Sequence, residues 1–182
     1  MLLSFGRHDV PLIPGIDRKS SVKLLGILFD EKLSFNDHVK CITKRATAKL
    51  YVVFRLRRIG FSIRELTLLY KALVLTTLTY CCSVWGGTSD ENLRKIDRVQ
   101  SKAVRLGIIN EYTPIKDIIR ISDEKLYRQI LDQGENHVLR EILPKRATGT
   151  SGLREKRPPV EATKFEHELR LFPSRILRSY QI

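Results

Sequence analysis

Apolar residues recur at helical spacing along residues 62–85, the longest apolar segment of the chain, and this pattern predicts one buried helix. The apolar stripe runs from Leu66 to Trp85, and further apolar side chains lie on the other sides of the same helix. A helix that is apolar nearly all round is typical of a protein interior. We therefore expect this segment to be the central helix of an all-helical unit. The positions to which we assign structural roles in and around it are Gly60, Ser62, Tyr70, Tyr80, Trp85 and Gly86.

Local signals mark both ends of this helix. Gly60 allows the preceding helix to end in the left-handed conformation. Ser62 and Glu65 have the spacing of a capping box, in which each side chain satisfies a backbone N–H at the helix start. Gly86 and Gly87 interrupt the chain at the other end, so that a new element begins beyond them.

Two amphipathic helices are predicted on either side of the central one. The first begins at a cap on Ser34 and ends near Arg58, and the second begins at a capping box of Thr88 and Glu91 and ends near Leu106. Cations in the last turn of a helix stabilise its dipole, whereas those along the helix body are candidates for phosphate contact without sequence choice. The candidate nucleic-acid-binding residues on these helices are Lys40, Lys44, Arg45, Lys49, Arg57, Arg58, Arg94, Lys95, Arg98, Lys102 and Arg105.

Four aromatic residues near these cations have two interpretations. An aromatic ring can stack on a nucleobase, which contributes about 1–3 kcal/mol per base. Tyr70, Tyr80 and Trp85 belong to the most apolar helix, so we expect them in the core; Tyr51 lies on the basic helix before it. The basic faces over 39–58 and 94–105 are the better candidates for contact.

The remaining segments complete a mainly α fold. Residues 1–33 predict a β-hairpin, with one strand at 2–5 and another over 22–29 that has Gly26 in its middle. After residue 106, one short helix starts at Thr113–Pro114 and another is capped by Ser122. We therefore predict three parts: the β-hairpin over residues 1–33, a helical bundle over 34–143, and a basic extended loop with a short helical tail over 144–182. The candidate binding residues in the loop are Lys145 and Arg146.

Charge is the strongest global signal. The chain has 182 residues, 42% of them hydrophobic, and a formal net charge of +13. A basic excess of this size favours a polyanionic partner, above all nucleic acid, because each neutralised phosphate releases condensed counterions. The alternative is a basic surface that is merely solvated.

Motifs for catalysis or metal binding are missing from the sequence. It contains no glycine-rich phosphate-binding loop and no paired histidines, and its three cysteines have no metal-ligand spacing. The four histidines are scattered, and we interpret them as surface or capping residues. We therefore assign no catalytic residue and no metal ligand.

No membrane or export segment is predicted. The apolar run after Lys71 is about 14 residues long, whereas a membrane-spanning helix needs roughly 20. The first ten residues lack the apolar run of a signal peptide. We expect an intracellular protein, nuclear or cytoplasmic.

Three stretches resemble a known family. They read SVKLLGILFDEKLSFNDHVK, LYKALVLTTLTYCCSVWGG and LRKIDRVQSKAVRLGI. In this order and spacing they are similar to the region that follows the palm in reverse transcriptases of non-LTR (LINE- and jockey-like) retrotransposons. The positions that match the family pattern are Leu25–Gly26, Leu33–Ser34–Phe35 with His38, Leu69–Tyr70–Lys71, Tyr80 with Trp85–Gly86, and Val99–Gln100 with Ala103 and Arg105.

The resemblance implies a primer-grip hairpin containing Leu25 and Gly26, followed by a helical thumb and a tail. The catalytic aspartates of that family, with their Mg2+, lie in the palm before this region, and the sequence contains no such motif. The partners implied are an RNA or DNA template–primer and the upstream polymerase domains. We therefore expect a fragment that binds nucleic acid but does not synthesise it alone.

A second hypothesis is that the chain is a helical protein-interaction or scaffold module derived from a decayed retroelement. In that case its charge would serve only solvation. The oligomeric state is open under either hypothesis.

Overall fold

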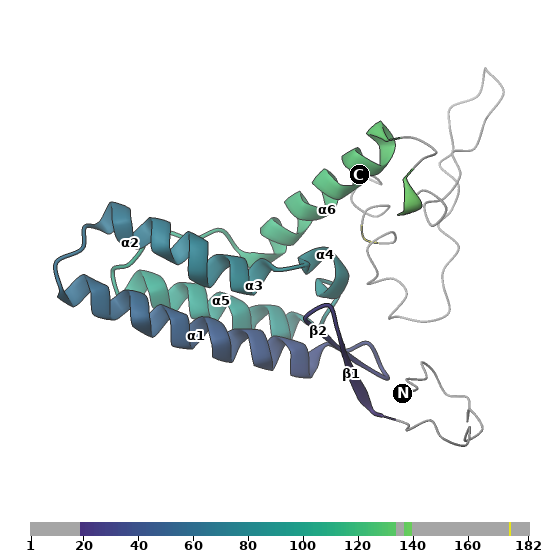
Figure 1. The fold of residues 1–182 in the computed structure, drawn as a ribbon, viewed down its shortest axis with the longest axis horizontal. Helices are drawn as coiled ribbons and strands as arrows, with labels where there is room; N and C mark the ends of the chain where they lie inside the picture. Colours follow the sequence, from purple (N-terminus) through teal and green to yellow (C-terminus); the bar gives the residue numbers. More distant parts are fainter. Residues whose placement is uncertain (1–18, 134–136, 140–174, 176–182) are drawn as a thin grey trace.

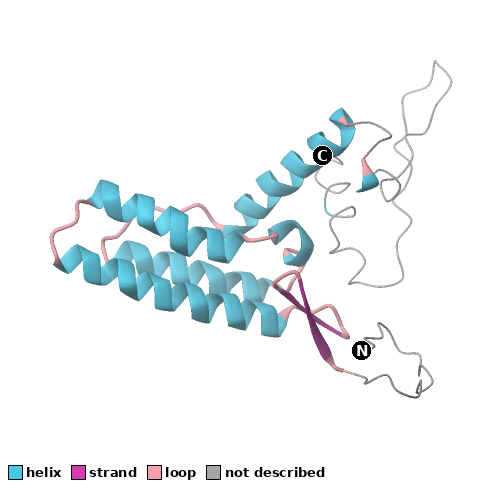
Figure 2. Cartoon of the chain, viewed as in Figure 1, coloured by secondary structure: helices cyan, strands magenta, loops and turns pink. Residues whose placement is uncertain are grey.

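A computed structural model describes residues 19–133, 137–139 and 175 of the chain (Figure 1). Within these residues a two-stranded hairpin precedes a series of helices, which confirms the predicted mainly α fold with a β-hairpin before it (Figure 2). The elements are β1 (Ser21–Leu24), β2 (Ile27–Asp30), α1 (Asn36–Arg58), α2 (Ile63–Leu69), the π-helical segment η1 (Tyr70–Leu75), α3 (Thr76–Thr79), α4 (Cys82–Trp85), α5 (Asp90–Arg105) and α6 (Ile115–Asp132).

The long helices pack around one apolar core. Helix α1, helix α5 and the α2–η1–α3 segment lie side by side, and α6 leaves the bundle at an angle (Figure 1). One stripe of each element is buried, as the helical spacing of apolar residues predicts. Core side chains with less than 2% exposure include Leu50, Leu66, Leu78, Trp85 and Ile96.

The hairpin differs from its prediction. Residues 22–29 are not one strand but contribute to both strands, which pair antiparallel with Leu24 opposite Ile27. Leu25 and Gly26 form the two-residue turn between them, with φ of 47° and 90°. Positive φ at both turn residues matches the right-handed twist of the strands, so Gly26 serves a tight turn rather than a bulge. The other strand that we predicted, over 2–5, lies outside the described residues.

The central helix is also not continuous. Residues 63–79 are helical, but Tyr80 is extended and Cys81 is left-handed, with φ of 48°, before the short helix α4 begins. The hydroxyl groups of Thr76, Thr77 and Thr79 donate to backbone carbonyls four residues earlier. Such bonds bend helices, and they concentrate just before this break.

Only one stripe of this segment is buried, contrary to the expectation of a helix buried on all sides. Leu66, Tyr70, Val74 and Leu78 repeat every fourth residue and are at most 3% exposed, whereas Leu68 is 62% exposed. Four residues of an α-helix overshoot one turn by about 40°. The wider turn of η1 reduces this drift and keeps the stripe directed at the core.

Tyr80 is the aromatic residue whose predicted core position is wrong. It is 53% exposed, and its hydroxyl donates to the carbonyl of Leu25 at 3.1 Å. Tyr70 and Trp85 are buried as predicted, at 3% and 0% exposure. Because the helix ends at Tyr80, the Tyr80 ring lies against the hairpin and not in the core.

Helix α6 replaces the two short helices predicted after residue 112. It runs without interruption through Ser122, whose hydroxyl oxygen lies 3.2 Å from that of Ser83. Asp123 therefore lies inside the helix rather than at a helix start. Its buried carboxylate accepts two hydrogen bonds from the Arg175 guanidinium, at 2.9 and 3.1 Å, and Arg175 also donates to the carbonyl of Ser83. Burial raises the pKa of Asp123, and the Arg175 charge acts in the opposite direction.

The division of the chain into three parts stays a prediction. The loop residues Lys145 and Arg146, and most of the hairpin part and of the tail, lie outside the described residues. Arg175 is the tail position that the structure describes, and its contact with α6 is long-range in sequence.

Replacing Arg175 with methionine should destabilise the protein by about 3 kcal/mol, because it leaves the carboxylate of Asp123 buried without its cation. Arg120→Met is the matched control, since it breaks an exposed pair with Glu124 that contributes less than about 1 kcal/mol. Urea unfolding measures both. Equal losses for the two variants would contradict a buried anchor at Asp123.

Candidate nucleic-acid interface

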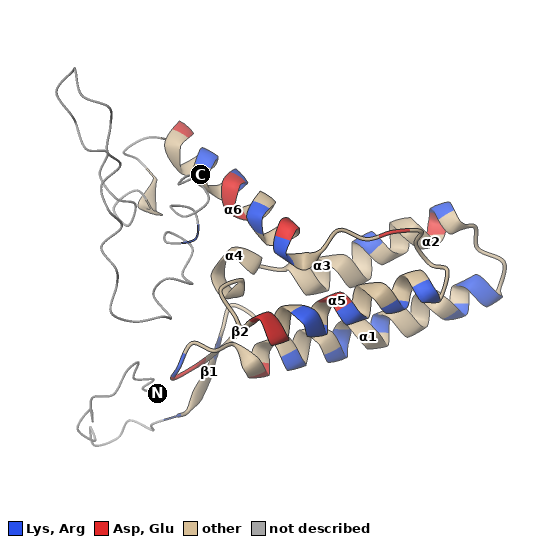
Figure 3. Cartoon of the chain, turned by 180° about the vertical axis from the view of Figure 1, so that it is seen from behind, with Lys and Arg blue, Asp and Glu red and all other residues tan. Residues whose placement is uncertain are grey.

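Helices α1 and α5 present their cations on the outside of the bundle. Both helices direct one apolar stripe inward, including Val39 and Ala46 on α1 and Ile96 and Ala103 on α5, all at 0% exposure. Lysine and arginine positions recur along both of these neighbouring helices (Figure 3), and most of their side chains are exposed. The amphipathic pattern of each helix thus directs its cations toward solvent.

The charge is unevenly distributed among the helices. Helix α1 has seven Lys or Arg residues and one acid, and α5 has five cations and three acids. Helix α6, in contrast, has four of each sign. The positive excess therefore lies on α1 and α5, which is where a polyanion would be attracted.

Eight of the eleven predicted cations on α1 and α5 are exposed and make no hydrogen bond or ion pair with other described residues. Two of the eight, Arg45 and Arg58, act on the His38 and Phe54 rings, which leaves six. We call these six residues the basic face. Since no protein group satisfies them there, they are available for phosphate oxygens. The basic face consists of Lys40, Lys44, Arg94, Arg98, Lys102 and Arg105.

Three other predicted cations on these helices contact groups of the protein itself. The Lys49 ammonium donates to Thr77 Oγ1 at 2.7 Å, which ties α1 to α3. The Arg57 guanidinium donates to the carbonyl of Leu106 at the end of α5, and the Arg58 guanidinium lies over the Phe54 ring at 5.4 Å. Lys49 and Arg57 thus link α1 to other elements of the bundle, whereas Arg58 contacts a ring of its own helix.

Arg45 and Lys95 each act on a nearby group of the protein. The positive charge of Arg45, which is exposed, lowers the pKa of the buried His38. Lys95 pairs with Glu91 at 3.0 Å and donates to Asn92 at 3.2 Å. The pairing lowers the pKa of Glu91 below its ordinary value.

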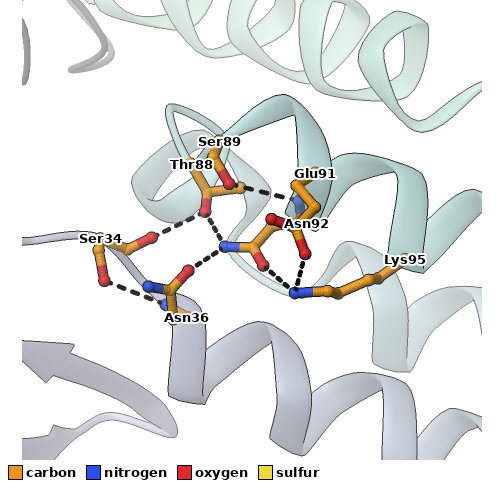
Figure 4. A network of polar contacts seen from close by, with 7 residues as sticks. All are labelled: Ser34, Asn36, Thr88, Ser89, Glu91, Asn92 and Lys95. Atoms are coloured by element: carbon orange, nitrogen blue, oxygen red, sulfur yellow. Dashed lines mark hydrogen bonds and ion pairs between the residues drawn. The ribbon is translucent and has the colours of Figure 1, made fainter.

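A polar network fixes the start of α5 against the start of α1 (Figure 4). The Thr88 hydroxyl donates to the carbonyl of Ser34 at 2.8 Å. The Asn92 amide donates to Asn36 Oδ1 at 2.7 Å and to Thr88 Oγ1 at 2.8 Å. Since Thr88 and Asn92 are buried, at 7% and 1% exposure, these bonds define how the two basic helices align.

The caps at these two helix starts differ from the predicted ones. Ser89, not Thr88, caps α5 by accepting from the backbone of Asn92. At α1 the cap position is Phe35, which has a left-handed backbone and no side-chain cap.

Asp30 orders the loop before α1. Its carboxylate accepts the backbone N–H groups of Lys32, Ser34 and Phe35. An acid at the start of a turn next to a helix is the signal that indicates this role.

His38 is buried, which corrects the expectation of a surface or capping histidine. It is 2% exposed, its ring lies 5.7 Å from that of Trp85, and its Nδ1 accepts the backbone N–H of Leu28 at 3.4 Å. Burial lowers the pKa of His38, and the nearby Arg45 charge lowers it further. The neutral imidazole thereby holds the hairpin against α1.

An open pocket of about 450 Å³ lies between α1 and α5, within the basic face. Lys44 and Tyr51 line it from α1, and Lys102 and Leu106 line it from the α5 side. Tyr51 is 61% exposed. The pocket thus brings together one cation of each helix, Lys44 and Lys102.

The described residues contain neither a metal-binding cluster nor a membrane-spanning helix. No three His, Cys, Asp or Glu side chains there are grouped closely enough to hold a metal ion. No helix in the described part of the chain is long and apolar enough to cross a membrane.

Comparison with known proteins supports a polymerase relationship. The chain is 30% identical over 93 residues to the probable RNA-directed DNA polymerase from transposon X-element of Drosophila melanogaster, which covers 50% of this chain and 10% of that protein. It is 28% identical over 92 residues to the probable RNA-directed DNA polymerase from transposon BS of the same species, with the same coverage. The chain thus matches about a tenth of the length of these curated relatives. No protein-family model and no solved structure matches the chain.

These similarities confirm the resemblance to retrotransposon reverse transcriptases. About half of the chain is a region related to the reverse transcriptases of retrotransposons. The described part of the chain is a helical bundle with a basic face.

The buried His38 makes stability depend on pH. Its folded-state pKa is lower than the ordinary value of 6.5, so its contribution is complete above pH 6.5 and is lost as pH falls toward the folded-state pKa. His38→Asn, which keeps an acceptor near Leu28 without a titrating ring, should flatten this decline in urea unfolding between pH 7 and pH 5. His137→Asn is the control and should retain the decline. An unchanged decline in His38→Asn would assign the pH dependence to other groups.

Proposed function

We propose that this chain is the thumb-like part of a non-LTR retrotransposon reverse transcriptase, located after the catalytic palm. Its role in the polymerase is to hold the template–primer by its backbone. The observation that carries the proposal is the basic face, with six exposed cations on two adjacent helices, none of which makes a hydrogen bond or ion pair with another described residue. The similarity to transposon RNA-directed DNA polymerases supports the same assignment.

Contact with phosphates is the interaction that this surface favours. The six residues are lysines and arginines on the outer sides of helices, and arginine and lysine are the usual partners of phosphate oxygens. Backbone contacts give affinity without sequence preference. A polymerase needs such contacts, because it must hold template–primers of any sequence.

The hairpin turn supports a second contact with the same ligand. Leu25 is 83% exposed at the tip, and Gly26 beside it has a φ of 90°, which L side chains rarely adopt, and lies against the Tyr80 ring. Tyr80 also fixes the turn by its bond to the Leu25 carbonyl. In the proposed assignment, this rigid turn is the primer grip.

Synthesis is not proposed for this chain by itself. The catalytic aspartates and their Mg2+ belong to the palm in the proposed assignment. The polymerase domains that precede this region in the family are therefore its expected partners.

Charge reversal on the basic face tests the proposal. Changing Lys44, Arg94, Arg98 and Lys102 to glutamate should weaken binding of an RNA–DNA hybrid duplex roughly 100-fold at low salt, because four phosphate contacts become repulsive. Fluorescence anisotropy with a labelled duplex measures the affinity.

The matched control changes four exposed cations elsewhere, Arg64, Lys71, Lys125 and Arg128, to glutamate, with the same change in net charge. It should reduce affinity only slightly. Equal affinities of the basic-face variant and the wild type would overturn the proposal and favour a scaffold module whose charge serves solvation.

A further inference from the structure

The pocket between α1 and α5 combines two kinds of surface. Its lining includes the apolar side chains of Ala48 and Leu106 and the ring of Tyr51. Lys44 and Lys102, two residues of the basic face, line it from the two helices. Phosphate contact alone requires the lysines but makes no use of the apolar surface beneath them.

The exposure of Tyr51 is the second unusual feature. Its side chain is 61% exposed, although it lies between two packed helices, and no described residue hydrogen-bonds to its hydroxyl. An exposed aromatic ring among cations is the arrangement with which proteins bind unpaired nucleotides, because the ring stacks on a base while the cations neutralise the adjacent phosphates.

We propose that this pocket receives one unpaired nucleobase of the bound strand. Tyr51 is the stacking platform, and Lys44 and Lys102 contact the phosphates on either side of that nucleotide. The inference rests on the proposed nucleic-acid binding and makes it more specific: the ligand at this point is single-stranded, such as an overhang next to the duplex. A paired base lies inside the duplex stack and does not present its face to Tyr51.

Charge argues against the other occupants of an apolar pocket. A second copy of the chain docked through the same face would bring its own six cations against these six. A protein segment would need acidic residues to match Lys44 and Lys102. Nucleic acid supplies both the flat apolar base and the negative charge.

Oligonucleotides with and without bases test this proposal on the full chain. The wild type should bind a 15-nucleotide oligothymidylate about 5- to 150-fold more tightly than an abasic strand of the same length, which corresponds to about 1–3 kcal/mol for one stacked base. Tyr51→Leu keeps an apolar side chain but removes the ring, so it should abolish this preference. Tyr51→Phe should retain it.

Three results separate the outcomes. Equal binding of both strands by the wild type overturns the base-binding pocket, although phosphate binding by the basic face stands. A chain that binds the hybrid duplex but neither strand at low salt overturns the pocket alone, whereas no binding of the duplex or of either strand overturns the proposed function itself. Concentration-dependent dimers in sedimentation that disappear in Tyr51→Leu identify a second copy as the occupant and also overturn the proposal. Thermal melting of each variant checks its fold, which the exposure of Tyr51 should preserve.

Discussion

The burial of Trp85 is the interaction on which the arrangement of the elements depends. The ring has no solvent exposure, and its indole N–H donates to the carbonyl of Tyr80 at 2.7 Å. This carbonyl is available because the chain leaves the helix at Tyr80 and Cys81. The His38 ring packs against Trp85, which connects the indole to α1 and, through Leu28, to the hairpin. The Trp85 side chain thus contacts both the helix break at Tyr80 and the start of α1.

The residues directly after Trp85 extend this junction to α5 and α6. A Cβ at Gly86 would lie 2.7 Å from Ile119, so glycine is needed for α6 to come close. Thr88 bonds to Ser34 and aligns α5 with α1. The basic face follows from this alignment, since the inward stripes of both helices leave their cations on one outer surface. Buried contacts at one end of the bundle therefore determine the surface that we propose for nucleic acid.

Regular helical features could be predicted from the sequence because they depend on neighbouring residues. The capping box of Ser62 and Glu65 is present, and Gly60 has the expected left-handed backbone, with φ of 102°. The break at Tyr80 could not be predicted in this way, because the bonds that stabilise it connect the segment to Leu25 and Trp85. The pair of Asp123 and Arg175 is likewise separated by 52 residues. The turn at Leu25 and Gly26 had a local signal, a glycine between two short apolar runs, which also fits a single strand.

The same limit applies to the candidate site. Sequence pattern identified the cations of α1 and α5 but did not separate the residues of the basic face from Lys49 and Arg57, which hydrogen-bond to groups outside α1. The most direct measurement of the central claim is the salt dependence of duplex affinity. If the basic face contacts up to six phosphates, the logarithm of the binding constant should fall with the logarithm of salt concentration with a slope of about −3 to −5, whatever the duplex sequence. A slope near zero, or an affinity that depends on sequence and not on salt, would contradict it.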